Sequence, residues 1–167
     1  NSGLDLHTIK TPFSGGSGAL PKNPAAAAAV LKTAIISIAL SAVLGLYLLL
    51  EQGAQLLIPG LTGLLIIVAY TSWINRMPWL CLIAPGTGFG LIMVGGSYYA
   101  LVGESSVTVL LVSLIPFFLV NNLLLLNQYP DIQPDRSVGR NHFPIRYGVG
   151  VSNRVFLGVL MCSAALL

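Results

Sequence analysis

The chain carries very little charge for its length. Of its 167 residues, eight are lysine or arginine and five are aspartate or glutamate, so that 8% are charged, whereas a soluble domain has roughly 25%. A soluble globular protein is therefore excluded, and the 55% of hydrophobic residues indicates a membrane protein. The few basic residues form no continuous stripe, which argues against binding to nucleic acid.

Cysteine is also scarce, and no targeting segment is visible. Cys81 and Cys162 lie far apart in apolar stretches, which predicts packing residues with no metal or redox role. The first residues lack the layout of a signal peptide. Because the chain starts at Asn1 without an initiator methionine, and an apolar stretch that opens near Val155 stops at Leu167 before it could span, we expect an internal fragment.

Long apolar runs, by contrast, are present. Four of them are about as long as a helix must be to cross a bilayer, roughly 20 residues, and they cover residues 25–50, 56–73, 79–102 and 107–126. We predict an all-α integral membrane multi-helix bundle with four complete transmembrane helices and the start of a fifth. The whole of 1–167 is expected to be one domain, with loops at 1–24 and 127–154.

The charges in the connecting segments alternate in sign along the chain. Two intervening loops hold Glu51 and Glu104 and no lysine or arginine. By the positive-inside rule, the basic segments are cytoplasmic and the acidic loops lie across the membrane. The basic residues of these segments are Lys10 and Lys22, then Arg76, then Arg136, Arg140, Arg146 and Arg154.

Small and polar residues interrupt the third and fourth apolar runs. Gly86 and Gly90 have the small-xxx-small spacing that favours tight helix packing, and a nucleotide-binding loop is disfavoured because no strand precedes them. Asn121 and Asn122 lie close to membrane depth. Their amides either form hydrogen bonds with neighbouring helices or face a polar cavity.

Two of the five acidic residues, Asp131 and Asp135, lie four apart where the fourth run meets the last basic loop. An ionised group at this depth is costly unless water or a cation compensates it, so the pair is the first candidate for chemistry. On a continued helix Asn127 would share their face, but Pro130 predicts a kink or a fresh helix start. In a new helix Pro134 would fall among the first amides, which lack helical partners anyway, and the face with both aspartates would survive.

The partner that best compensates two adjacent carboxylates is a divalent cation. Mg²⁺ is usually held by one or two carboxylates together with waters and substrate phosphates, and the downstream guanidinium groups would then bind phosphate oxygens. The alternative is an interfacial ion network in which the aspartates pair with Arg136 or Arg140. The spacing alone does not decide between these two interpretations.

The residues around the pair resemble a known motif. The run Asn-Gln-Tyr-Pro-Asp-Ile-Gln-Pro-Asp-Arg at 127–136, with Gly-Arg at 139–140 and Pro-Ile-Arg-Tyr-Gly at 144–148, resembles the second aspartate-rich motif of UbiA-type intramembrane aromatic prenyltransferases. Ser-Gly-Leu-Asp at 2–5 and Thr-Pro-Phe-Ser-Gly-Gly-Ser-Gly at 11–18 resemble the end of the first motif and its loop, in the form of the menaquinone-type branch. The resemblance covers the whole chain.

This resemblance implies a nine-helix fold in the cell inner (cytoplasmic) membrane, with both motifs on the cytoplasmic side. It implies Mg²⁺-dependent transfer of a polyprenyl group from a polyprenyl diphosphate to an aromatic acceptor. The favoured acceptor is 1,4-dihydroxy-2-naphthoate, and 4-hydroxybenzoate or another quinone precursor is the alternative. The implied metal-binding residues are Asp5, Asp131 and Asp135, the last two also catalytic, and the implied diphosphate-binding residues are Lys10, Asn127, Arg136 and Arg140.

The chain departs from the family pattern in two places. The earlier residues of the first motif would precede Asn1, so half of the metal site is missing, and we expect the fragment alone not to turn over substrate. Many family members also carry a tyrosine with a lysine four residues later. Here Ile74 stands four residues after Tyr70, and the nearest basic residue is Arg76.

Three further residues near the motifs have two interpretations each. His7 and His142 could assist proton removal from a phenolic acceptor, but loop histidines without a partner are more often incidental. Arg146 could contact the diphosphate or could be a solvated loop residue.

Two other functional classes compete with the prenyltransferase. An ion-coupled transporter would bind a cation with midplane carboxylates, whereas the acidic pair here sits at the end of a span beside a basic loop. A purely structural membrane subunit would use the aspartates for assembly only.

Overall fold

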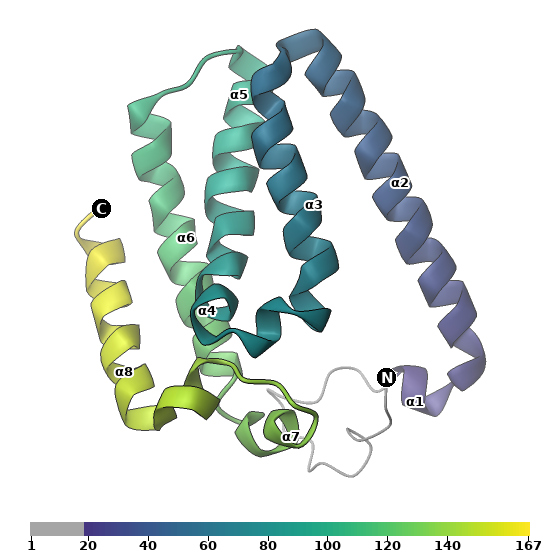
Figure 1. Cartoon of the computed structure of the whole chain (residues 1–167). Helices are drawn as coiled ribbons and strands as arrows, with labels where there is room; N and C mark the ends of the chain where they lie inside the picture. Colours follow the sequence, from purple (N-terminus) through teal and green to yellow (C-terminus); the bar gives the residue numbers. More distant parts are fainter. Residues whose placement is uncertain (1–18) are drawn as a thin grey trace.

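The computed structural model describes residues 19–167, and the regular secondary structure of this part is entirely helical. Figure 1 shows the helices as a bundle whose long members run up and down. The α-helices are α1 (Ala19–Lys22), α2 (Ala27–Gln52), α3 (Leu57–Ser72), α4 (Pro78–Gly86), α5 (Gly96–Val102), α6 (Val107–Asn127), α7 (Ile132–Ser137) and α8 (Phe143–Ala164). Shorter 3-10 turns are η2 (Pro24–Ala26), η3 (Ala54–Leu56) and η4 (Ile74–Arg76), and η5 (Thr87–Gly95) is a π-helix.

Four of the helical segments are long and apolar enough to cross a membrane, which confirms the predicted all-α bundle with four complete spans. Their bounds lie close to the predicted ones. The first two each consist of a 3-10 turn followed by an α-helix, the third consists of α4, η5 and α5, and the fourth is α6 alone. The segments are Pro24–Gln52, Ala54–Ser72, Pro78–Val102 and Val107–Asn127.

The spans place the connecting segments at two opposite ends of the bundle. At one end lie α1, η4 and α7, and at the other lie the α2–α3 and α5–α6 connections (Figure 1). Glu51 and Glu104 therefore belong to one end, whereas Arg76 in η4 and Arg136 in α7 belong to the other. The separation of charge that the sequence suggests is a feature of the fold.

The first two spans have no buried residue in the described structure. Large apolar side chains on α2, such as Leu31 and Leu50, are mostly exposed. A continuous apolar surface of this kind is unfavourable in water but suits a helix whose neighbours are lipid chains. The core instead lies among α4, η5, α6 and α8, where most of the buried residues are found.

The third span changes its helical register in the middle. Pro85 has no N–H to donate to the helix, and the nine residues from Thr87 to Gly95 are π-helical. The N–H of Gly86 donates to Oδ1 of Asn121 on α6 at 2.6 Å. The side-chain amide of the neighbouring helix therefore accepts a hydrogen bond from the backbone N–H next to the proline. Backbone groups buried in a membrane require such a partner.

Gly86 and Gly90 lie directly against α6, which confirms the interpretation as tight helix packing. A Cβ at Gly90 would lie 2.5 Å from the Phe117 backbone nitrogen and 2.6 Å from the Ser113 carbonyl oxygen. At Gly86 it would clash with the Phe117 carbonyl. The fourth span also bonds to α8, because Nδ2 of Asn122 donates to the Phe156 carbonyl at 3.0 Å. Both asparagines thus form hydrogen bonds between helices, the first of the two interpretations given above.

The last helix starts earlier than predicted. It begins at Phe143, not near Val155, so residues 143–154 are helical, and the predicted loop over 127–154 is wrong for its second half. Gly148, with φ of 78°, breaks this helix into a short first piece and a longer second piece, which Figure 1 shows turning upward along α6. Glycine suits this position because side chains disfavour positive φ. Cys81 is buried as predicted, but Cys162 on α8 is exposed and is not a packing residue in the described structure.

We expect Gly90→Ala to lower the free energy of unfolding by about 1–3 kcal/mol, because the new methyl group meets rigid backbone on α6. Gly88→Ala is the matched control, since a Cβ there meets no atom within 4 Å and the residue lies in the same π-helix. Thermal unfolding of the detergent-solubilised protein measures both. Equal midpoints for the two variants would contradict the packing role of Gly90.

Candidate functional site

The two aspartates lie one helical turn apart, just beyond the end of the fourth span. The α6 helix ends at Asn127, and Asp131 directly precedes α7. The backbone N–H of Asp135 donates to the Asp131 carbonyl at 2.9 Å, so the two residues share a helix face. The predicted fresh start after Pro130 is confirmed. Pro134 is the third residue of α7, where its missing N–H costs no hydrogen bond.

Asn127 does not extend this face, because it belongs to α6 and not to α7. The continued helix that would have aligned it with both aspartates is absent from the described part of the chain. The side chain of Asn127 is exposed. Asp131 is partly exposed and Asp135 is buried, so the two carboxylates lie in different surroundings.

Asp135 is held by two nitrogen-bearing side chains from the segment that follows α7. Nη1 of Arg140 donates to Oδ1 of Asp135 at 2.8 Å, and Nε2 of His142 lies 3.2 Å from Oδ2. The second contact is within hydrogen-bond distance but lacks the geometry of a hydrogen bond, and it is an electrostatic contact. The Arg140 backbone N–H also donates to the Asp135 carbonyl at 3.0 Å.

These contacts determine the charge of the carboxyl. Burial of Asp135 opposes ionisation, but the His142 imidazole and the Arg140 guanidinium outweigh it, and the pKa of Asp135 lies below its ordinary value. Asp135 is therefore a carboxylate at neutral pH. The ion network proposed as the alternative to a metal site is present for Asp135 with Arg140.

His142 is a site residue that the sequence interpretation treated as incidental. It is 2% exposed and contacts Asp135, so it is not a loop histidine without a partner. It directly precedes α8. The sequence around His142 has no hydrophobic periodicity that would predict its burial. It stands seven residues after Asp135 and just before Phe143 and Pro144. Its burial depends on the path of the chain between α7 and α8.

The loop before α8 is tied to the loop between the second and third spans. The Asn141 backbone N–H donates to the Asn75 carbonyl at 3.0 Å, and the Asn75 side chain donates to the Thr71 carbonyl at 2.6 Å. Asn75 Oδ1 has no hydrogen-bond partner among the described residues. The η4 turn thus supports the segment that carries Arg140 and His142.

The remaining predicted residues are placed differently. Arg136 is exposed, and its Nη2 donates weakly to the Ile145 carbonyl at 3.4 Å. Arg146 is also exposed, in the first turns of α8. Asp5, Lys10 and His7 lie outside the described residues.

The donor set is compatible with Mg²⁺. No group of three or more His, Cys, Asp or Glu side chains that could hold a metal occurs within residues 19–167. Mg²⁺ needs only one or two carboxylates when phosphates and waters complete its shell. Asp131 and Asp135 are oxygen donors on one face, and each carboxylate oxygen has two lone pairs, so Asp135 can bind a cation and keep one of its present contacts.

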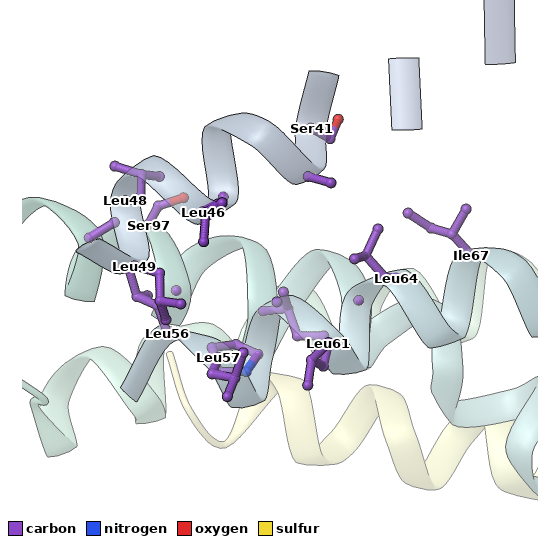
Figure 2. A pocket seen from close by; sticks show the side chains of 18 residues that line it. Ser41, Leu46, Leu48, Leu49, Leu56, Leu57, Leu61, Leu64, Ile67 and Ser97 are labelled. Carbon is purple, nitrogen blue, oxygen red and sulfur yellow. The ribbon is translucent and has the colours of Figure 1, made fainter. Parts of the chain in front are cut away.

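A cavity of about 510 Å³ lies elsewhere, between α2, α3 and α5. Figure 2 shows leucines of α2 and α3, such as Leu46, Leu49 and Leu61, around it, and Ser41 and Ser97 are the labelled polar residues. Its lining contains no titratable residue and nothing from α6, α7 or α8. This cavity is suited to an apolar molecule and is separate from the candidate site.

Because the pKa of Asp135 is lowered on folding, its ionised form stabilises the fold above the unfolded pKa of about 3.9. That stability is lost as pH falls through the folded pKa. We expect Asp135→Asn to lower the unfolding midpoint most near pH 7, and the difference from wild type to shrink as the pH approaches 3. Exposed Glu104→Gln is the control and should show a small difference at every pH. A pH-independent difference for Asp135→Asn would contradict the lowered pKa.

Comparison with known proteins gives one result. The family model described as the UbiA prenyltransferase family matches residues 21–167, nearly the whole described chain. Neither the comparison with curated proteins nor that with solved structures found a match. The match includes α7, the loop with Arg140 and His142, and all four spans. The chain therefore belongs to the UbiA prenyltransferase family, whose members transfer prenyl groups to aromatic acceptors.

Proposed function

We propose that this protein transfers a polyprenyl group from an isoprenyl diphosphate to 1,4-dihydroxy-2-naphthoate, with Mg²⁺, in menaquinone biosynthesis. The observation that carries the reaction is the arrangement at α7: Asp131 and Asp135 share one turn, and Arg140 lies 2.8 Å from Asp135. Carboxylates suit a divalent cation, and guanidinium groups match phosphate oxygens. The choice of naphthoate is supported by the form of residues 2–18.

The catalytic and metal-binding residues in this proposal are Asp131 and Asp135, joined in metal binding by Asp5. A bound Mg²⁺ would supply electrostatic stabilisation of the leaving diphosphate. The diphosphate-binding residues are Lys10, Asn127, Arg136 and Arg140.

Arg140 has a double role in this proposal. Its side chain is 40% exposed, although it pairs with buried Asp135. An arriving diphosphate carries more negative charge than the carboxylate, and a cation at Asp135 would compete with the guanidinium. As the site fills, Arg140 can therefore turn from Asp135 toward the diphosphate. The buried Asp135 carboxylate is not left unpaired, because the cation takes the place of the guanidinium. The apolar surroundings of the spans would keep water from the reactive allylic carbon.

Other acceptors and another class of function remain as alternatives. 4-Hydroxybenzoate or a further quinone precursor would require the same diphosphate site, so only product analysis separates them. An ion-coupled transporter is disfavoured, because Asp131 and Asp135 lie beyond the end of the fourth span. Among the described residues the buried asparagines of that span are used in contacts between helices.

We propose further that the end of the bundle with α7 faces the cytoplasm in the inner membrane. It carries Arg76, Arg136 and Arg140, in or beside η4 and α7, whereas Glu51 and Glu104 lie at the α2–α3 and α5–α6 connections of the opposite end. Short basic loops remain on the cytoplasmic side during insertion.

We expect Asp131→Ala to reduce prenylation of 1,4-dihydroxy-2-naphthoate more than roughly 100-fold, since loss of even an outer-shell partner of a metal ligand costs 10–100-fold. The assay follows pyrophosphate release and prenylated product from the full-length protein with Mg²⁺ and a polyprenyl diphosphate. Glu104→Gln, a carboxylate at the other end of the bundle, should keep its activity. Unchanged activity of Asp131→Ala, or no turnover by wild type with any aromatic acceptor, would refute the proposal.

The proposed orientation predicts a labelling pattern in intact cells. A cysteine introduced as Glu104→Cys should react with a membrane-impermeant maleimide added outside, because the α5–α6 connection faces away from the cytoplasm. Ser137→Cys, at an exposed position of α7, should react only after the cells are permeabilised. Wild type, which carries Cys81 and Cys162, measures the background. The reverse pattern would show that the orientation is wrong.

A further inference from the structure

The two contacts of Asp135 differ in how freely they can be released. The Arg140 side chain is 40% exposed, whereas that of His142 is 2% exposed. An exposed arginine can change rotamer and exchange its partner for water or a ligand. A fully buried imidazole has no such freedom, because its neighbours are close-packed.

The backbone around His142 is fixed on both sides. Its carbonyl accepts hydrogen bonds from the N–H groups of Ile145 and Arg146, both at 3.1 Å. On the other side Asn141 is bonded to η4. The next residue, Phe143, is 1% exposed, and its ring packs edge-on against Trp79 of α4 with centroids 5.0 Å apart. The position of the imidazole is therefore set by α4, η4 and α8 together.

The burial of the imidazole is explained by its contact with a carboxylate. Nε2 lies 3.2 Å from Oδ2 of Asp135, and Nδ1 has no hydrogen-bond partner among the described residues. Buried polar side chains are nearly always paired, so the contact with Asp135 explains the burial of this histidine better than packing alone does. Since a carboxylate only accepts hydrogen bonds, its attraction to the imidazole requires a hydrogen on Nε2.

We propose that His142 is a positioning residue that holds the Asp135 carboxylate in its metal-binding orientation when Arg140 turns to the diphosphate. This inference rests on the proposed function. The buried Nε2–H stays against Oδ2, so that Oδ1, released by Arg140, faces the cation. Groups that contact a metal-binding side chain on the side away from the metal typically contribute roughly 10–100-fold to metal affinity. In this proposal His142 is such a group for Asp135.

The test compares three substitutions of His142 in the full-length protein. Glutamine can place an amide N–H near the position of Nε2, whereas asparagine is shorter and places it near Nδ1, so the two are matched in chemistry and differ in reach. Alanine removes both nitrogens. Mn²⁺, used as the probe for the magnesium site, is titrated into the purified protein without substrates, and free Mn²⁺ is followed by electron paramagnetic resonance.

We expect His142→Ala and His142→Asn to weaken Mn²⁺ binding by roughly tenfold or more, and His142→Gln to stay within about threefold of wild type. Half-maximal Mg²⁺ concentrations for prenyl transfer should follow the same order. A purely structural histidine would not distinguish glutamine from asparagine. If the alanine variant does not fold, the comparison of these two amides still decides.

Three outcomes overturn the inference: equal Mn²⁺ affinity in all variants and wild type, equal losses in the glutamine and asparagine variants, or no Mn²⁺ binding by wild type. Failure of the proposed function looks different. In that case wild type would show no turnover with any aromatic acceptor, while the order of Mn²⁺ affinities could still be measured.

Discussion

A backbone N–H or C=O left unpaired in the hydrocarbon of a bilayer costs several kcal/mol, and this constraint governs how the spans are built. It is met easily in α2 and α3, which are helices without a fully buried residue. The third span contains Pro85 and cannot meet it alone. The amide of Asn121 pairs the Gly86 N–H, and the absence of side chains at Gly86 and Gly90 lets α6 come close enough for that bond. The contact between these two spans is thus where the bundle is fixed.

The position of the candidate site follows from that contact. Because α4 and α6 are locked together, the start of α4, the η4 turn before it and the end of α6 lie at the same end of the bundle (Figure 1). The chain leaving α6 makes the single turn of α7 and then runs past η4, where Asn141 bonds to Asn75. That path brings Arg140 and His142 to Asp135. The site is therefore built on the ends of packed helices, and Arg140 is the side chain in it that is free to change rotamer.

Much of this could be predicted from the sequence, and the failures have physical causes. The four spans were predictable because length and hydropathy are local properties of each segment. The fresh helix start at α7 was predictable because Pro130 and Pro134 act on their own neighbours. The start of α8 was missed because residues 143–154 are polar enough to resemble a loop, although Phe143 and Pro144 are buried. His142 was misjudged because nothing near it in sequence shows that it is buried.

The sequence by itself determined the class of protein, the number of described spans and the residues that carry charge near the membrane surface. Hydrocarbon burial and the scarcity of ionised groups leave few alternatives for these features. Only the tertiary structure decided which residues meet. Gly86 is hydrogen-bonded to Asn121, and Asn75 to Asn141. Asp135 contacts Arg140 and His142, although Arg136 is nearer in the sequence. Gly86 and Gly90 mark a packing face in the sequence, but they do not show which helix packs there, because that depends on the close fit of glycine and backbone between neighbouring helices.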